Sequence, residues 1–379
     1  SLSIKSILIM KNILFTVLNC LFIAFSSCTN PGKKENNQSV LEINIDESSQ
    51  NKAIIKKKIS VLNENIDFLG EISSFDMIDE SRFVVSTVNP SNIYIYYKEG
   101  NQVKNINING KGPFELLNPS IIKYYKNKIY IWGSNQLKLL TFDLNGNSIN
   151  EHTGFKYAIK DFIIYKNYVL FYESGGPKEY ISIYDLNKNK YIKKFGNASN
   201  EHLILDVYSC SGGMALWNDK LFYCSSDELS IHNININSLK ESTLIKLKDP
   251  QFEINKYQGT VKNLINKDKN KLINYINNNS VIKGIHIYKN NILLIAEIGN
   301  YIMNENHMDY SNRYKKYYYI HKNNKKTETH ISKVRPNNSC LFTVYKDQIY
   351  SIQMKKHNGE FKYYLFNISF NNSEKNKID

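Results

Sequence analysis

Several residue types and sequence features are scarce or absent in this chain, and each absence excludes a class of protein. Seven prolines among 379 residues exclude a collagen-like or proline-rich chain. A mean hydropathy of −0.44 excludes a protein that crosses a membrane many times. Five cysteines without a Cys-x-x-Cys pair exclude a disulfide scaffold and a zinc ribbon.

Familiar catalytic motifs are missing as well. The eight histidines show no His-Glu-x-x-His and no close pair, so no metal site is predicted. A divalent metal bound in a channel by distant histidines, such as His202, His286 and His357, is not excluded by the sequence. No Gly-x-Ser-x-Gly nucleophile elbow occurs, and Gly110 and Gly112 do not open a helix after a strand, which argues against a dinucleotide site. No cofactor and no catalytic residue is predicted.

Positive charge is abundant but dispersed. The net charge is +14, yet most lysines stand singly among Asn, Ile and Tyr. The compact runs are short and contain at most three residues, as from Lys56 to Lys58. Nucleic-acid binding uses clustered Lys and Arg, so we expect no nucleic-acid partner. The hydrophobic fraction of 42% is large enough for a sizeable core.

The N-terminal segment has the pattern of an export signal. Lys11 precedes an apolar stretch from Ile13 to Phe25, which has the length of a signal-peptide core and is short for a spanning helix. We interpret residues 1–27 as a signal peptide, with residues 1–9 as an extension upstream of Met10. Phe25-Ser26-Ser27-Cys28 resembles the bacterial lipobox, although Phe25 departs from the usual Leu. An ordinary secretory signal and an N-terminal anchor helix are the alternatives.

Residues 28–58 are predicted to form a lipidated Cys28 followed by a flexible polar tether. Two acyl chains would hold the protein stably on a membrane. The expected location is therefore the cell envelope, as an outer-membrane lipoprotein that faces the periplasm or the cell surface. Cys210, Cys224 and Cys340 cannot all pair within one chain, so their disulfide state is left open.

An internal repeat dominates the rest of the chain. An apolar strand, a short polar turn and a second apolar strand recur six times, with turn residues at Glu80, Asn127, Asn167, Asp219, Asn290 and Asp347. The intervals are 47, 40, 52, 71 and 57 residues, and a propeller blade takes about 40 to 50. A second hairpin follows each of the first five copies, as at Asn145-Gly146. Each unit therefore predicts four strands.

The two ends of the repeat predict how the ring closes. The last copy is followed by one more strand, Phe361 to Phe370, while Ile59 to Leu62 precedes the first copy. An N-terminal strand that completes the last blade would leave no long open edge. We therefore predict an all-β, six-bladed β-propeller over residues 59–370, monomeric, with one short helical insertion within residues 250–283 and a polar tail at 371–379.

Three segments carry a resemblance to a known family: Phe68 to Ser73, Gly110 to Glu115 and Phe142 to Gly146. Together they resemble the six-bladed β-propeller lipoproteins of Bacteroidetes-type bacteria, which are related in fold to NHL-repeat and TolB-like propellers. The resemblance covers about residues 59–370. Gly110 to Glu115 is similar to the family's Gly-x-Gly-Pro-Gly-Glu turn, with Phe114 in place of the last Gly. The resemblance implies the fold and says little about function.

Insertions and strand ends indicate a candidate binding face. The connections at residues 196–211, 250–283 and 297–316 are long, and we expect all three to leave the same face. An aromatic face with a few hydrogen-bond acceptors suits a sugar or a peptide. The predicted site residues on that face are Trp132, Glu115, Glu173, Asp227 and Glu297. The alternative is that Trp132 packs between blades and that the carboxylates are solvated.

The function predicted from these features is a non-catalytic binding or scaffold module, anchored to a membrane through Cys28, whose partner is an envelope protein or a glycan. The alternative is a propeller hydrolase or lyase with a metal or carboxylate site at the channel mouth. A third interpretation, a structural assembly subunit, predicts an exposed apolar patch on the long-loop face. The question of catalysis is left open, with binding favoured.

Overall fold

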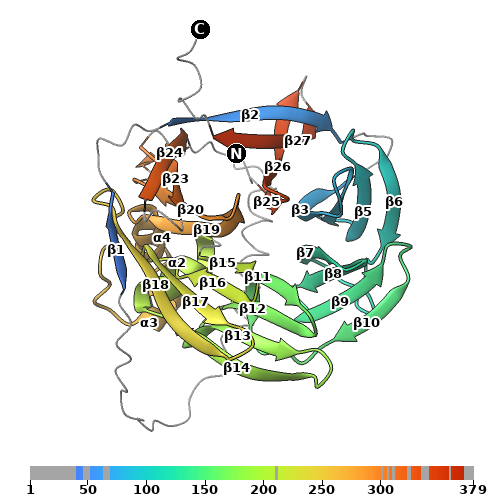
Figure 1. Cartoon of the computed structure of the whole chain (residues 1–379), viewed down its shortest axis with the longest axis horizontal. Coiled ribbons are helices and arrows are strands. Elements are labelled where there is room, and N and C mark those ends of the chain that lie inside the picture. Colours follow the sequence, from blue (N-terminus) through green and yellow to red (C-terminus); the bar gives the residue numbers. More distant parts are fainter. Residues whose placement is uncertain are drawn as a thin grey trace.

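The protein is an all-β, six-bladed propeller with four-stranded blades arranged around a central axis (Figure 1). The computed structural model describes residues 40–45, 52–62, 69–209, 212–300, 302–304, 307–309, 312–321, 326–333, 341–357 and 360–370. The predicted signal peptide, Cys28, Cys210, Cys340 and the C-terminal tail lie outside the described residues. The predicted fold class is confirmed.

Blades one to three are antiparallel sheets whose first strand lies nearest the axis and whose fourth strand lies at the rim (Figure 1). Blade one contains β3 (Glu71–Met77), β4 (Arg82–Val88), β5 (Asn92–Tyr97) and β6 (Gln102–Asn107). Blade two contains β7 (Pro119–Tyr125), β8 (Lys128–Gly133), β9 (Lys138–Asp143) and β10 (Ser148–His152). Blade three contains β11 (Ala158–Tyr165), β12 (Tyr168–Ser174), β13 (Glu179–Asp185) and β14 (Lys190–Asn197).

Blades four to six follow the same order, and the N-terminal segment adds an edge strand to blade four and supplies the fourth strand of blade six. Blade four contains β15 (Gly213–Trp217), β16 (Lys220–Cys224), β17 (Ser230–Asn235) and β18 (Lys240–Lys248), with β1 (Leu41–Asn44) at its edge. Blade five contains β19 (Val281–Tyr288), β20 (Asn291–Ile298), β23 (Tyr314–His321) and β24 (Lys326–Lys333), with the hairpin of β21 (Ile302–Asn304) and β22 (His307–Asp309) between β20 and β23. Blade six contains β25 (Leu341–Tyr345), β26 (Gln348–His357), β27 (Glu360–Phe370) and β2 (Lys52–Val61).

The second strands show why the sequence forms a ring of stacked blades. Nearly every residue of β4, β12 and β20 is buried. A strand covered on both faces has a continuous apolar run rather than an alternating pattern, and neighbouring blades supply that cover. The fourth strands β6 and β10 are mostly exposed, because they form the rim.

The repeated polar turns connect the first and second strands tightly. Lys126-Asn127, Lys289-Asn290 and Lys346-Asp347 all have positive φ at both positions. Two consecutive positive φ values define the type I′ turn, whose twist matches that of a hairpin. The predicted hairpin at Asn145-Gly146 is present between β9 and β10, and Gly146 supplies the left-handed conformation with a φ of 87°.

The N-terminal segment closes the ring. β2 pairs antiparallel with β27 from Ile54 to Val61, as expected for a strand that completes the last blade. Before that, Lys52 and Ala53 pair in parallel with β24 of blade five. β1 pairs in parallel with β18, so both β1 and the start of β2 lie within the span that the sequence predicted as a flexible tether.

Three short helices interrupt the described strands: α2 (Asn200–Ser209), α3 (Val261–Lys267) and α4 (Lys269–Asn277). The predicted insertion at residues 250–283 contains α3 and α4, whereas α2 was not expected. Within the described part of the chain, no helix is both long enough and apolar enough to span a bilayer.

Candidate functional site

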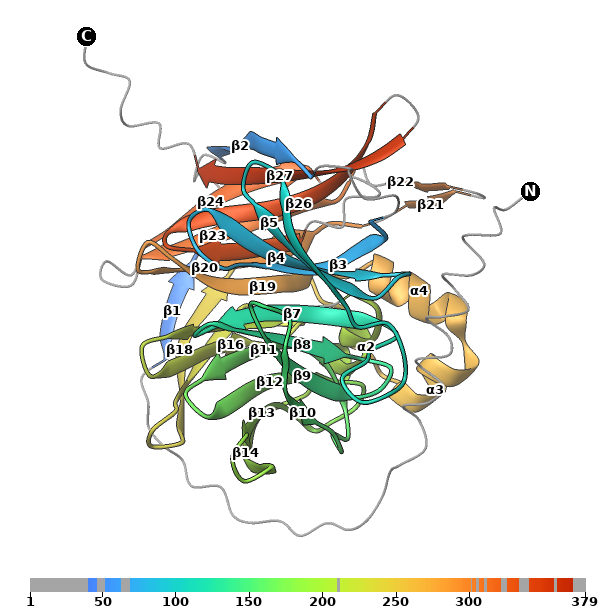
Figure 2. The same cartoon turned by 90° about the vertical axis from the view of Figure 1, so that its right-hand side faces the viewer.

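Three connections build an additional layer on one face of the ring. α2 lies between blades three and four, α3 and α4 lie between blades four and five, and the β21–β22 hairpin lies within blade five. Figure 2 shows these elements together on the right-hand side of the ring, so the long connections leave the same face. We call α2, α3 and α4 the helical layer.

The helical layer has a small apolar cluster of its own. Ile204, Leu264 and Leu272 pack together and are at most 3% exposed. Glu201 at the start of α2 accepts a hydrogen bond of 2.9 Å from the Tyr257 backbone N–H. The Asp268 carboxylate accepts one of 3.0 Å from the Lys271 N–H, which caps α4. The helices are thus fixed to one another as well as to the blades.

A polar cleft lies beside the helical layer, and we call it the amide cleft. Its volume is about 300 Å³, and it opens to solvent between the blade-four-to-five connection and the loop that follows β20. Its polar lining includes Gln251, Glu253, Asn278, Asn300, Asn312 and Tyr314. None of these residues was among the predicted site residues, because amides scattered in an Asn-rich sequence give no motif.

Asp227 is a predicted site residue that borders an open cleft. This second cleft, of about 610 Å³, is also lined by Glu228, Lys248, Asp249 and Lys256. The Asp227 carboxylate accepts a hydrogen bond of 2.6 Å from the Ser199 hydroxyl, just before α2. Asp227 therefore ties the helical layer to blade four and faces a polar cleft.

Trp132 lies in the core between blades two and three. Its side chain is 0% exposed, and its ring centroid lies 5.0 Å from that of Phe155 and 5.7 Å from that of Phe171. Its indole N–H has no hydrogen-bond partner among the described residues. This is the packing arrangement that the sequence analysis gave as the alternative, and a ring without exposed surface offers no face to a ligand.

Glu173 and Glu297 are buried and each has its own positively charged partner. The Glu173 carboxylate lies 2.5 Å from Lys194 Nζ and accepts a hydrogen bond of 2.6 Å from Ser182. Glu297 lies 3.4 Å from Arg313 Nε. The structure thus distributes the predicted acceptors over several blades and does not bring them together around one ligand position.

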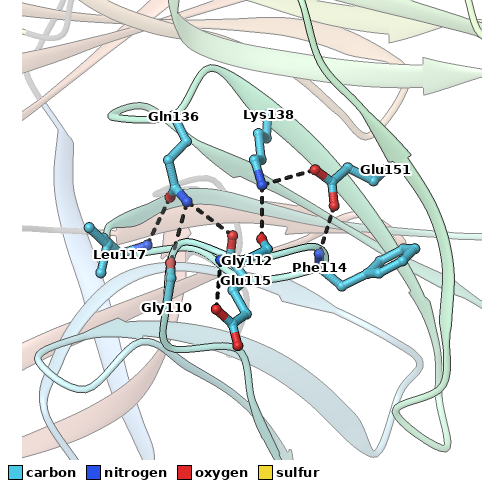
Figure 3. Close-up of polar contacts among 8 residues, drawn as sticks. All are labelled: Gly110, Gly112, Phe114, Glu115, Leu117, Gln136, Lys138 and Glu151. Carbon is cyan, nitrogen blue, oxygen red and sulfur yellow. Dashed lines mark hydrogen bonds and ion pairs between the residues drawn. The ribbon is translucent and has the colours of Figure 1, made fainter.

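Glu115 stabilises the turn that carries it (Figure 3). Its carboxylate accepts a hydrogen bond of 2.7 Å from the Gly112 N–H. A Cβ added to Gly110 would lie 1.9 Å from that carboxylate, so any larger residue there would displace the Glu115 side chain from this hydrogen bond. Glu115 is therefore part of the turn structure.

Three side chains of blade two fix the same turn from the other side (Figure 3). The Gln136 amide accepts from the Leu117 N–H at 2.9 Å and donates to the carbonyls of Gly110 and Glu115. Glu151 accepts from the Phe114 N–H at 2.6 Å and pairs with Lys138, which also donates to the Gly112 carbonyl. The Gly110 to Glu115 motif therefore has a structural role, since these hydrogen bonds fix the conformation of its turn.

Polar groups from several innermost strands meet in the channel. Lys123 Nζ on β7 lies 2.9 Å from the Asp161 carboxylate on β11, and each side chain is 31% exposed. Asp76 on β3 accepts hydrogen bonds of 3.0 Å from the Tyr124 N–H and from Thr343 on β25. These contacts link the neighbouring blades six, one, two and three around the axis.

The channel perturbs the acid–base behaviour of these groups. Burial raises the pKa of Asp76, while the positive charge of Lys123 opposes that rise. Burial, the largest influence on Lys123, lowers its pKa, but Asp161 and Asp76 outweigh it and the net pKa is raised. Burial together with the charge of Lys123 lowers the pKa of His286 on β19 to about 3.

The sequence contains a signal for this channel cluster that was not used. One polar residue stands three positions before the repeated turn in four of the six first strands. These residues are Asp76, Lys123, His286 and Thr343, which precede Asp79, Lys126, Lys289 and Lys346. Aligning the repeats by their turns reveals the position, since equivalent residues of the innermost strands face the same axis.

His202 and His286 lie in different parts of the molecule. His202 is 1% exposed beneath the helical layer, where its Nδ1 lies 2.7 Å from the Ser226 hydroxyl, and burial lowers its pKa. The side chain of His357 is outside the described residues. Cys224 is free and buried, and burial raises the pKa of its thiol, which lowers its reactivity. In the described part of the chain, no group of three or more His, Cys, Asp or Glu could hold a metal ion.

Comparisons with known proteins agree with the ring geometry. An exported protein of Bacteroides fragilis, so described, has a TM-score of 0.62 at 12% identity, covering 88% of this chain and 100% of that one. A Bacteroides vulgatus protein from a family of unknown function has a TM-score of 0.57 at 12% identity, covering 85% and 100%. At such low identity these similarities concern the fold alone. No curated protein matches the sequence.

A comparison with protein-family models identifies the family of this chain. A family model described as "6-bladed beta-propeller" matches residues 32–298, which is more than half of the chain. The matched span includes β1, the closing strand β2 and the first five copies of the repeated hairpin. This chain belongs to that six-bladed β-propeller family.

Proposed function

We propose that this protein is an envelope-anchored, non-catalytic binding module that holds a protein or glycan partner on the face of the helical layer. The observation that carries the proposal is that three separate connections converge on one face, and that the helices of two of them pack around their own apolar cluster. Loops on a rigid scaffold commonly carry binding function. Asp227 and the amide cleft are the polar contacts offered beside that layer.

The pairing of the charged groups supports binding over catalysis. Glu173 and Glu297 are buried and each has a positively charged partner within 3.4 Å, which holds them in structural roles. A catalytic acid or base needs a proton-transfer position free to meet the substrate. The groups of the described clefts instead offer hydrogen bonds at an open surface.

The charge of the helical layer indicates the nature of a protein partner. α3 and α4 carry Lys262, Lys267, Lys269 and Lys271. Asp268, at the junction of the two helices, pairs with Lys271 at 3.3 Å. A basic surface attracts acidic surfaces and raises their association rate. We therefore expect a protein partner to be acidic where it meets α3 and α4.

Export and anchoring are part of the proposal. Lys11, the apolar stretch from Ile13 to Phe25 and the residues before Cys28 support export and lipidation, and the fold is shared with a protein described as exported. Replacing Cys28 tests the anchor: Cys28→Ala should move the protein from the membrane to the soluble fraction. If Cys28→Ala remains in the membrane fraction, the lipid anchor is refuted.

Partner capture from envelope extracts tests the binding face. The double variant Lys262→Glu/Lys269→Glu should lose the species that the unaltered protein enriches, because both lysines are exposed on the helical layer. The control is Lys104→Glu on the exposed rim strand β6, which should capture the same species as the unaltered protein. Equal capture by all three proteins would contradict the proposed face.

The channel cluster favours a second candidate function, a hydrolase or lyase that works in the channel. Asp161 and Lys123 keep partial contact with solvent although they lie among the innermost strands. Metal analysis of the purified protein tests this candidate. A stoichiometric divalent ion that is lost in His286→Gln would support catalysis in the channel and would argue against the binding module.

A further inference from the structure

We propose that the amide cleft binds one neutral sugar residue, such as the terminal unit of a glycan. This inference rests on the proposed function, because it selects one of its two partner classes. It is based on the cleft's lining, in which Gln251, Asn278, Asn300 and Asn312 place four side-chain amides around a volume of about 300 Å³. No predicted site residue belongs to this cleft.

The cleft is held in shape from below by Arg313, which is 2% exposed. Its guanidinium donates to the Asn279 carbonyl at 3.1 Å and to the Gly299 carbonyl at 2.9 Å, so it joins the two walls of the cleft. The Glu253 backbone N–H also donates to the Ser280 hydroxyl at 3.2 Å, and the Ser280 N–H donates back to the Glu253 carbonyl. A preformed cleft loses little conformational entropy when a ligand binds.

Gln251 presents a hydrogen-bond donor to the cleft. Its side-chain carbonyl oxygen accepts hydrogen bonds from the Tyr314 hydroxyl at 3.0 Å and from Lys316 Nζ at 2.8 Å. Both contacts use the acceptor atom, and the amide NH₂ of Gln251 has no partner within the described residues. Its backbone N–H donates to Asp249 at 2.9 Å, which fixes the residue in place.

The chemistry of the lining fits a sugar better than an ion. A side-chain amide has an NH₂ donor and a carbonyl acceptor, of which Gln251 uses the acceptor and Asn278 uses the donor within the protein. Each sugar hydroxyl is both a donor and an acceptor, so it can meet either group that is left. Anions are disfavoured because Glu253 lines the cleft while Lys316 is 4% exposed and lies 2.6 Å from Asp249. Divalent cations prefer several carboxylates, and Glu253 is the one carboxylate among the residues that line the cleft.

The size of the cleft and its aromatic residue agree with one sugar ring. A volume of about 300 Å³ is the space of about ten water molecules, and a hexose has about twelve non-hydrogen atoms. Tyr314 is half-buried against the apolar cluster of blades four and five, which fixes its ring at the edge of the cleft. A shallow site of this kind predicts a dissociation constant on the order of 1 mM for a monosaccharide.

Saturation-transfer NMR on the full chain tests the inference. The probes are glucose, galactose, mannose and N-acetylglucosamine, and the detergent must contain no sugar. At least one probe should bind, and Gln251→Ala and Asn312→Ala should each weaken that binding at least tenfold. The control is Asn150→Ala, an exposed amide on the rim strand β10, which should bind like the unaltered protein. Circular dichroism verifies that each variant is folded.

The outcomes separate this inference from the proposed function. Absence of binding for all four sugars would overturn the sugar site, and so would equal binding by folded Gln251→Ala, Asn312→Ala and unaltered protein. Calcium binding that is lost in the cleft variants would also overturn it, because the cleft would then be a cation site. In each of these cases, capture that still depends on Lys262 and Lys269 would leave the proposed binding face standing.

Discussion

The half-buried His286 on the innermost strand β19 makes the stability of the propeller depend on pH. The pKa of His286 is lowered to about 3 from an ordinary value of 6.5, because burial and the charge of Lys123 disfavour the imidazolium. The unfolded chain therefore binds a proton at His286 before the folded chain does. Stability is full above about pH 6.5 and is lost progressively as the pH falls toward 3.

The size of this effect follows from the two pKa values. The pKa of His286 differs between the folded and the unfolded chain, and this difference corresponds to a loss of about 2 kcal/mol in the free energy of unfolding between pH 7 and pH 5. The His286 side chain is half-buried, so solvent screening reduces the effect and we expect about 1 to 2 kcal/mol. Other titrating groups contribute as well, and a variant is needed to isolate the histidine.

The variant His286→Gln keeps a polar side chain but removes the titration. Urea unfolding followed by far-UV circular dichroism at pH 5, 6 and 7 measures the free energy of unfolding for both proteins. Relative to its own value at pH 7, the variant should lose about 1 to 2 kcal/mol less at pH 5 than the unaltered protein. His286→Asn should behave in the same way. Parallel pH profiles for the three proteins would refute the reasoning.

Three further predictions concern the core, the turn and the N-terminal strand. Trp132→Ala should lower the free energy of unfolding by about 3 to 5 kcal/mol and Trp132→Phe by less, measured by urea unfolding; equal losses would contradict the packing role. Gln136→Ala should cost about 1 to 3 kcal/mol in the same assay, because three backbone groups lose their partner; an unchanged midpoint would contradict this. Ile43→Asp should detach β1 and speed amide exchange at Ile45 while leaving β16 protected, and unchanged exchange at Ile45 would show that Ile43 does not hold β1.

The fold could be predicted from sequence because its information is local and repeated. A strand, a polar turn and a strand recur six times, and positive φ at Lys126-Asn127 and its equivalents is encoded by the turn residues themselves. The closing strand could be foreseen because the last unit lacks a partner. Its length could not: Lys52 and Ala53 pair with blade five through backbone bonds that any sequence can form.

The candidate site depended on contacts that no local pattern encodes. Trp132 stands in the same apolar run as its neighbours on β8, and only the approach of Phe155 from the connection to blade three and of Phe171 from blade three buries it. Arg313 stands in an ordinary polar loop, yet it joins two walls of a cleft by hydrogen bonds to Asn279 and Gly299.

The sequence alone therefore determined the number of blades, the strand order and the closure, since these follow from periodicity and turn chemistry. The tertiary structure alone decided which polar residues meet. Lys123 and Asp161 lie on the innermost strands of neighbouring blades, and only the packing of these blades side by side brings their side chains to 2.9 Å. Periodicity specifies which residues share a strand face, but the distance between faces is set by how the blades pack.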